Sequence, residues 1–384
     1  MKLTEIQAII KPLTRYLEKY QEYKYTVMKW QPEDVIKNFS DLDIFIVIDT
    51  TDIDLLIKID SDFIQLYKEM INGSVANARC LEHTPYLITS EEIRCGFGYR
   101  NQIVTWSLLH GDDKAYTSDI KPYQLLPYDD DDNTYYLSII NSKDKYDLKD
   151  ELIYTHHPKE VFTRYCLCWR YYATSLYAIA SILEHKRIIG KRAALRRVSS
   201  LFPGMKYSTY KDLIEVINSY QGSENQLMHE LRDDISIAKQ ALTDDTSKIK
   251  INLPNSINIT RKFARAVYII RNKVSRMSLY LSQEYDSLRL PESFIKNLIQ
   301  REIDDMVMLS GVVKETLQYL KLSNNNNLGN LNILSEKLDA QVEQLSPNSR
   351  DSFQLIHDHC KFAIKQYNQT SIDLINSLCV HGQR

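Results

Sequence analysis

Two aspartates one residue apart, Asp41 and Asp43, stand directly before an apolar run at residues 44–48. Side chains at positions i and i+2 of a strand project from one face, so this spacing presents both carboxylates to one point. Because the run is apolar on both faces, it predicts a central strand buried on both sides. Paired carboxylates at the start of a rigid strand suit Mg²⁺, which takes its other oxygen ligands from waters and substrate phosphates. The alternative is that Asp41 caps a turn and Asp43 is an ordinary charge at the strand entry.

The residues Ser40, Asp41, Leu42 and Asp43, followed by the apolar run, resemble a known metal-binding signature. It is that of the DNA polymerase β-like nucleotidyltransferase superfamily, which includes the small antibiotic-modifying adenylyltransferases. The resemblance covers about residues 24–115. It implies that the two aspartates hold two Mg²⁺ ions for a nucleoside triphosphate and that Ser40 orients the strand entry. In that family a Gly-Ser pair on the preceding turn cradles the triphosphate, and a later strand supplies a third carboxylate.

The turn before the motif departs from the family pattern. Twelve residues ahead of Asp41, where the family has its Gly-Ser pair, this chain has Lys29 followed by Trp30. Only 10 glycines occur in 384 residues, so we expect no glycine-rich phosphate loop elsewhere. Lys29 is the candidate at this turn because a lysine contacts a phosphate as a point charge. A lysine beside a packed tryptophan is as easily an ordinary surface residue.

The pattern leaves the third carboxylate open. Residues 102–109 predict the later strand and contain no acid, whereas Glu92 precedes this stretch and Asp112 follows it. The adjacent Glu91 and Asp113 are further alternatives. Such a carboxylate would bind the second metal or activate the acceptor, so Glu92 and Asp112 join the aspartate pair as candidate catalytic residues.

A basic segment at residues 185–197 is the expected partner of the aspartate pair. It holds six lysines and arginines and no acid, in a chain whose net charge is only −2. Lys191 and Arg192 follow Gly190 at a predicted helix junction and are the candidates for gripping the β- and γ-phosphates. In the resembling adenylyltransferases a helical second domain supplies such residues. The alternative is that this positive charge complements the dipole of the preceding helix.

Length and composition exclude several classes of protein. A chain of 384 residues exceeds the size of a usual single core, which predicts two domains. No run of about 18 apolar residues occurs, and the amphipathic N-terminal segment carries acids, so we expect a cytoplasmic protein with no membrane partner. Neither the Walker-type nor the dinucleotide-binding glycine motif is present. The six cysteines are scattered without a C-x-x-C pair, and we expect them to be reduced and buried.

The periodicity changes near residue 150 from short β-rich runs to helical spacing. Before this point, residues 129–132 predict a solvated loop and residues 134–140 a strand. After it, a long helix is expected to begin at Pro158, where the missing amide donor does no harm. Further helices are predicted over residues 208–221, 224–243, 260–283, 292–322, 330–346 and 349–380, with a polar break at 323–329.

Together these patterns predict an α+β protein. Residues 1–150 are expected to form a nucleotidyltransferase-like domain with a mixed sheet and helices, and residues 151–384 an all-α helical bundle with a sub-boundary at 323–329. We expect a Mg²⁺-dependent enzyme that moves a nucleoside monophosphate, most simply AMP from ATP, to a hydroxyl or similar group. A small-molecule acceptor is favoured over a protein or an RNA.

Alternatives from other classes stay open. The missing Gly-Ser pair favours a catalytically inactive nucleotidyltransferase-like scaffold. In the helical half, Arg350 followed by His357 matches the loose pattern of RNA-cleaving HEPN-type modules. A basic helix is compatible with RNA or another polyanion, although such charges usually form the solvated face of a bundle helix. Its basic residues are Arg261, Lys262, Arg265, Arg271, Lys273 and Arg276.

Overall fold

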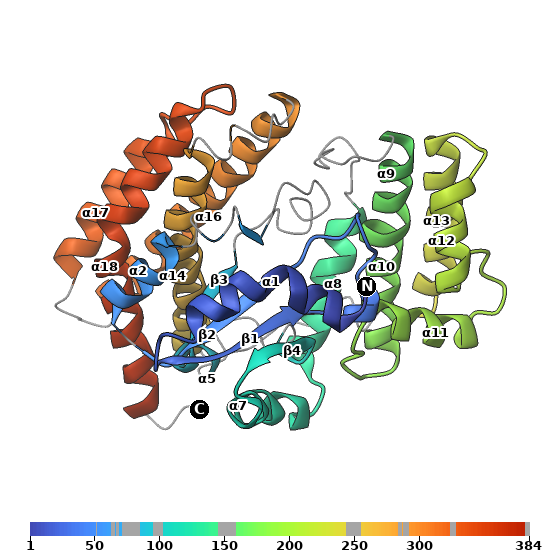
Figure 1. Cartoon of the computed structure of the whole chain (residues 1–384), viewed down its shortest axis with the longest axis horizontal. Helices are drawn as coiled ribbons and strands as arrows, with labels where there is room; N and C mark the ends of the chain where they lie inside the picture. The colour runs from blue at the N-terminus through green and yellow to red at the C-terminus, as the bar shows by residue number, and fades with distance from the viewer. Residues whose placement is uncertain are drawn as a thin grey trace.

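A small mixed sheet surrounded by many helices makes up the computed structural model of the chain (Figure 1). The residues that the structure describes are 1–50, 52–62, 66, 69–70, 85–94, 103–144, 159–242, 255–282, 286, 292–322 and 328–380. The α+β class predicted from the sequence is therefore confirmed, with strands in the N-terminal part and helices through most of the remainder.

The four strands of the sheet have the order β3-β2-β1-β4. They are β1 (Tyr23–Lys29), β2 (Ile44–Ile48), β3 (Tyr86–Thr89) and β4 (Trp106–Gly111). Strand β1 runs antiparallel to both β2 and β4, whereas β2 and β3 are parallel. The end of β1 and the starts of the other three strands therefore lie at the same end of the sheet. We call this the Lys29 end, and the opposite end the Tyr23 end.

Strand β2 is central, and all five of its residues are buried, as its apolar sequence predicts. Alternate residues enter different cores because successive side chains of a strand point to opposite faces. Ile44, Ile46 and Ile48 pack in one hydrophobic cluster, while Phe45 stacks on Trp106 in another. A strand enclosed on both faces is a rigid support for whatever stands at its entrance.

Helix α1 (Leu3–Leu17) covers the first of these faces. Its buried residues Ile6, Ile10, Leu13 and Leu17 recur at steps of three and four, which places them on one side of the helix. Helices α5 (Ser90–Arg94) and α7 (Asp113–Leu125) follow β3 and β4. A short 3₁₀ turn, η1 (Pro32–Asp34), lies between β1 and β2.

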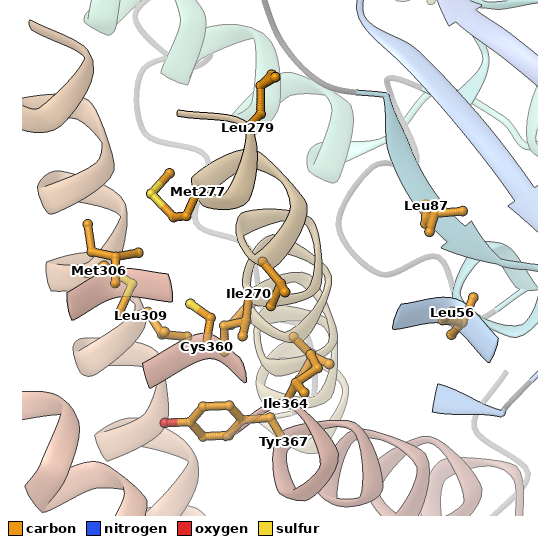
Figure 2. Close-up of a cluster of buried hydrophobic side chains, with 14 of the residues drawn as sticks. Leu56, Leu87, Ile270, Met277, Leu279, Met306, Leu309, Cys360, Ile364 and Tyr367 are labelled. Atoms are coloured by element: carbon orange, nitrogen blue, oxygen red, sulfur yellow. The ribbon is translucent and has the colours of Figure 1, made fainter. Parts of the chain in front are cut away.

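One group of helices packs beside the sheet on the side of β3 (Figure 1). It consists of α2 (Ile53–Ser61), α14 (Asn255–Tyr280), α16 (Glu292–Leu322), α17 (Leu328–Val342) and α18 (Asp351–Val380). Figure 2 shows their common core, where Ile270 and Met277 of α14 meet Met306 of α16 and Cys360 and Ile364 of α18. The helices predicted over residues 260–283, 292–322, 330–346 and 349–380 are confirmed by these elements.

A second group of helices lies on the other side of the sheet (Figure 1). It consists of α8 (Asp130–Asp144), α9 (Lys159–Tyr165), the π-helix η3 (Cys166–Tyr172), α10 (Ala173–Leu183), α11 (Lys191–Leu201), α12 (Tyr210–Ser219) and α13 (Glu224–Lys239). These helices share a hydrophobic cluster of their own, joined by Ile36 and Phe39 from the N-terminal part. The helical residues after 150 therefore pack in two cores on opposite sides of the sheet rather than in a single bundle.

Two predictions made for residues 129–140 are wrong. Residues 134–140 are helical within α8, because Tyr136 and Ile140 are buried at a spacing of four residues, which one face of a helix accommodates. Asp132, expected in a solvated loop, is completely buried, and its Oδ2 accepts a hydrogen bond from Arg187 Nη2 at 2.6 Å. Asp132 therefore takes part in a buried ion pair instead of lying in the solvated loop that the run of four acids suggested.

Other predictions have simpler outcomes. The strand expected over residues 102–109 is found at Trp106–Gly111. The long helix expected from Pro158 is formed by α9, η3 and α10, and Pro158 itself lies outside the described residues. Cys166, Cys168 and Cys360 are buried thiols, as expected, while the side chains of the other cysteines lie outside the description. Within the described ranges, no helix is long and apolar enough to cross a membrane.

Candidate functional site

Asp41 and Asp43 lie in the segment that leads into β2, at the Lys29 end of the sheet. Leu42 between them is buried, whereas the side chains of Asp41 and Asp43 are 27% and 31% exposed. The alternation of buried and exposed side chains therefore begins before β2. Both carboxylates lie on the face opposite to Leu42, at the start of a rigid central strand.

Each of the two carboxylates has a cationic neighbour. Lys29 Nζ lies 3.8 Å from Asp43 Oδ2, and Arg170 Nη2 lies 3.4 Å from Asp41 Oδ1. Both separations exceed the roughly 2.7–2.9 Å of a strong charge-assisted hydrogen bond. Lys29 is held beside the motif by its own backbone amide, which donates to the Asp43 carbonyl at 3.0 Å. The candidate phosphate contact chosen from the sequence is thus next to the aspartate pair.

Arg170 was not singled out from the sequence, although a signal was present. It is the only charged residue between Arg164 and Glu184, in a stretch otherwise made of apolar, aromatic and small residues. A lone charge in a buried helix requires a partner or a function. Arg170 comes from the π-helix η3, and π-helical segments are rare and often occur at functional sites.

The turn at Trp30 has an unusual backbone. Its φ of 71° lies in the left-handed region, which favours glycine and is an outlier for a bulky residue. Trp30 follows Lys29 where the resembling family has its Gly-Ser pair. The surrounding structure holds the tryptophan in place, because its ring packs edge-on against Tyr177 with 4.7 Å between ring centroids. A strained residue held by its neighbours is typical of a functional site.

Lys191 connects this turn to the π-helix. Its Nζ lies 5.5 Å from the ring centroid of Trp30 and 5.3 Å from that of Trp169, and it donates to the Trp169 carbonyl at 3.1 Å. Burial lowers the pKa of the Lys191 amine to about 7, and the charges of Lys29 and Arg170 act in the same direction, while the charge of Asp34 opposes them. A further anionic group nearby would favour the charged form of this buried amine.

The backbone of Lys191 and Arg192 is occupied by Asp34. The carboxylate accepts from the Lys191 amide at 2.9 Å and from the Arg192 amide at 3.1 Å, at the N-terminus of α11. Gly190 precedes the helix with a φ of 93°, and a Cβ there would lie 2.6 Å from Asp34 Oδ2. Burial raises the pKa of Asp34 and the two amides oppose that rise. Only the side chains of Lys191 and Arg192 therefore remain as candidates for phosphate binding.

The other two candidates beside this site have structural partners. The Arg192 guanidinium lies over the ring of Tyr210, 3.6 Å from its centroid. Ser40 is buried, accepts from the Ile36 amide at 3.0 Å and is 3.1 Å from the Tyr165 hydroxyl. Ser40 thus fixes the loop before Asp41.

The structure places the candidate third carboxylates at the Tyr23 end of the sheet, away from Asp41 and Asp43. Strands β3 and β4 both start at the Lys29 end, so the residues after them stand at the opposite end. Glu92 is buried and bonded to Arg271, and Asp112 caps α7 by accepting from the amide of Lys114 at 2.8 Å. Glu91 and Asp113 lie in the first turns of α5 and α7.

The donor set beside the site fits a hydrated Mg²⁺ ion better than a closed protein cage. Among the described residues, no group of three acids, histidines or cysteines is placed to hold a metal. Mg²⁺ is commonly bound by one or two carboxylates, with waters and substrate phosphates completing its octahedron. Asp41 and Asp43 supply that minimum, and both are partly exposed to solvent.

A cavity of about 460 Å³ lies elsewhere, along α1 and the edge strand β4. Lys11, Arg15, Glu18 and His110 are among its lining residues, and neither Asp41 nor Asp43 lines it. His110 Nε2 lies 3.1 Å from Glu18 Oε1, a contact that ties the end of α1 to β4. This cavity is therefore separate from the aspartate pair.

In the basic helix proposed as a polyanion surface, Lys262 and Arg265 are exposed, as a solvated face requires, whereas the three later charges are buried. Arg271, Lys273 and Arg276 of α14 are at most 7% exposed. Arg271 pairs with Glu92, while Lys273 and Arg276 both pair with Glu302 of α16. Both expectations for these three charges, a solvated face and an RNA contact, are wrong because each charge faces a carboxylate inside the protein.

In three comparisons with known proteins, the chain matches no family model, no curated protein and no solved structure. The class of protein is therefore defined by the fold and the site alone. It is an α+β protein in which two carboxylates, two partly exposed cations and one buried lysine meet at one end of a mixed sheet.

Proposed function

We propose that this chain is a Mg²⁺-dependent nucleotidyltransferase that moves a nucleoside monophosphate, AMP from ATP in the simplest case, to a hydroxyl of a small-molecule acceptor. The observation that supports it most is the meeting of Asp41 and Asp43 with Lys29, Arg170 and Lys191 at the entrance of the central strand. Carboxylates for a metal and cations for phosphates are the two components that phosphate chemistry requires.

The reaction makes different demands on the two kinds of residue. A bond forms between the acceptor oxygen and the α-phosphorus while the hydroxyl proton passes to water, the bond from that phosphorus to the oxygen that bridges the α- and β-phosphates breaks, and pyrophosphate leaves. Asp41 and Asp43 would hold Mg²⁺, which neutralises phosphate oxygens near the point of attack. Lys29, Arg170 and Lys191 would stabilise the negative charge that accumulates on the leaving pyrophosphate.

Thermal stability with each nucleoside triphosphate, with and without Mg²⁺, tests this function. A ligand at 100 times its dissociation constant adds about 2.7 kcal/mol to the free energy of unfolding. We expect one nucleotide to stabilise the wild type only with Mg²⁺, and Asp41→Asn to lose the effect. Asp49→Asn is the matched control, because Asp49 follows the far end of β2 and pairs with Lys24 at 3.3 Å. Absence of stabilisation by every nucleotide would disprove the proposal, as would equal loss in the control.

A catalytically inactive nucleotide-binding scaffold is the second candidate. It is favoured because, in the described part of the chain, no third acid stands beside Asp41 and Asp43. The two functions separate in one assay, in which pyrophosphate release is followed with a mixture of hydroxyl acceptors. A scaffold would bind the nucleotide without releasing pyrophosphate, whereas the enzyme would release it and lose that activity in Asp41→Asn.

A further inference from the structure

The two carboxylates of the candidate site are already neutralised by the protein. Lys29 reaches Asp43 from the end of β1, and Arg170 reaches Asp41 from the π-helix on the other side of the site. Two positive charges therefore balance two negative ones before any ligand arrives. A bare divalent cation approaching this pair meets little net attraction, because each carboxylate shares its charge with a fixed neighbour.

The two carboxylates cannot bind Mg²⁺ and keep both side-chain cations in their present places. A Mg²⁺ ion binds carboxylate oxygens at about 2.0–2.1 Å. Asp41 Oδ1 and Asp43 Oδ2 already have a guanidinium and an ammonium group at 3.4 Å and 3.8 Å. Since like charges repel most where water is partly excluded, metal binding favours the departure of both groups.

Lys29 and Arg170 are able to leave without unfolding their elements. Both side chains are 21% exposed, and both are long and flexible. Their separations from the two carboxylates exceed the usual hydrogen-bond length, so these two ion pairs oppose movement only weakly, and Lys29 Nζ also lies 5.3 Å from the ring centroid of Trp30. Lys191 differs, because it is buried and fixed by the Trp169 carbonyl.

We propose that Lys29 and Arg170 guard the metal-binding carboxylates in the nucleotide-free protein and move to the triphosphate when Mg²⁺ arrives with it. Metal and nucleotide then bind as a pair, each weakly without the other. The inference rests on the proposed function, since the triphosphate is the destination of the two released cations. It assigns a ligand-binding role to Arg170, a residue outside the signature that suggested the site.

The test measures Mn²⁺ binding by the loss of its free EPR signal, with and without a non-hydrolysable ATP analogue. We expect the wild type to bind Mn²⁺ at least about tenfold more tightly when the analogue is present, equivalent to about 1.4 kcal/mol. Arg170→Gln should tighten the binding of Mn²⁺ alone and weaken that of Mn²⁺ with the analogue, each by several-fold to about tenfold. Arg197→Gln is the control, because Arg197 of α11 pairs with Glu184 at the end of α10, at a separate surface position.

If one substitution tightens the binding of Mn²⁺ alone and weakens its binding with the analogue, the side chain moves between carboxylate and triphosphate. A purely structural role would weaken both affinities or change neither. Weaker or unchanged binding of Mn²⁺ alone in both Arg170→Gln and Lys29→Gln would overturn the inference. Lys29→Gln provides the same reading at Asp43, so misfolding of one variant leaves the test intact. If no nucleotide analogue binds the wild type, the proposed function fails separately, and tighter Mn²⁺ binding in the variants still supports the guarding of the carboxylates.

Discussion

Acids and bases meet in two regions of this molecule, with opposite results. At the Lys29 end of the sheet, the pairs formed by Asp41 and Asp43 are separated by 3.4 Å and 3.8 Å, and all four side chains are 21–31% exposed. On α14, the Arg271 and Arg276 guanidinium groups lie 2.8 Å and 3.1 Å from Glu92 and Glu302, and these side chains are 0–7% exposed.

The difference lies in what solvent and ligands can reach. A buried ion pair repays its desolvation only with good geometry and further hydrogen bonds, and Arg271 also donates to the Leu87 carbonyl at 2.8 Å. Such a network joins α14 to β3 and α16. The looser, partly exposed pairs contribute little stability and leave their carboxylates accessible to solvent. Similar residue types therefore hold the fold together in one region and remain accessible in the other.

Replacing Glu302 should give the largest loss of stability. Although burial alone would raise the pKa of Glu302, the charges of Lys273 and Arg276 lower it overall, and the carboxylate is ionised. Glu302→Ala leaves both cations buried without it, and we expect about 3–5 kcal/mol less free energy of unfolding in urea denaturation. Asp305→Ala is the control, since Asp305 pairs with Lys273 from a 33% exposed position, and its loss should be about 1 kcal/mol. Equal effects would remove the distinction between buried and exposed partners.

Asp60 should make the buried region sensitive to pH. Burial raises the pKa of this carboxyl from 3.8 to about 8 despite the nearby Arg271 and Arg276, and its Oδ2 has no hydrogen-bond partner. Between those values the folded protein binds one more proton than the unfolded chain, so stability falls as pH rises from about 4 to about 8. The slope contributed by one proton approaches about 1.4 kcal/mol per pH unit. Denaturant titrations of Asp60→Asn across this range should lack that contribution, and an unchanged slope would contradict the assignment.

Beside the candidate site, Asp34 makes a buried contact with the start of α11. Gly190→Ala forces a Cβ against Asp34 Oδ2 in a left-handed backbone, and we expect a loss of about 1–3 kcal/mol in the free energy of unfolding. Gly204→Ala is the matched control because no atom lies within 4 Å of its added Cβ. It should change stability by less than about 1 kcal/mol. A tolerated alanine at Gly190 would show that Asp34 does not fix the start of α11.

Asp41→Asn should have the smallest effect on stability. Its pair with Arg170 is partly exposed to solvent, and surface pairs contribute about 0–1 kcal/mol to stability. We expect the urea midpoint to stay close to that of the wild type, so that loss of nucleotide binding in this variant reports on the site alone. A loss above about 2 kcal/mol would place this pair with the structural network of α14 and weaken its candidacy as a ligand site.

Local patterns predicted the elements whose burial has a clear period. The helix over residues 292–322 matches α16 at both ends, and the apolar run at 44–48 is a buried central strand. Residues 134–140 failed, because a short apolar run with tyrosines suits a strand or a helix equally well by composition. Packing in the second helical core decided for the helix, and the sequence patterns did not predict that core as a separate unit.

At the candidate site, the direction of the strands decides which residues meet in space, and nearness along the chain does not. Lys29, Asp41 and Asp43 meet because β1 and β2 are antiparallel neighbours, and Lys191 of α11 lies over the ring of Trp30, the residue after Lys29. Glu92 and Asp112 do not meet them, because the ends of β3 and β4 lie at the Tyr23 end of the sheet. Arg170 is absent from the signature and reaches Asp41 only through tertiary packing.

By itself the sequence determined which residue types stand at the entrance of the central strand, because strand alternation and burial are local properties. Only the tertiary structure decided which charges are structural and which are accessible. Arg271 and Arg170 are both arginines in helical segments, yet Arg271 is buried with Glu92 and Arg170 borders solvent beside Asp41. The physical reason is that the energy of a charge depends on its surroundings, which packing between distant segments creates.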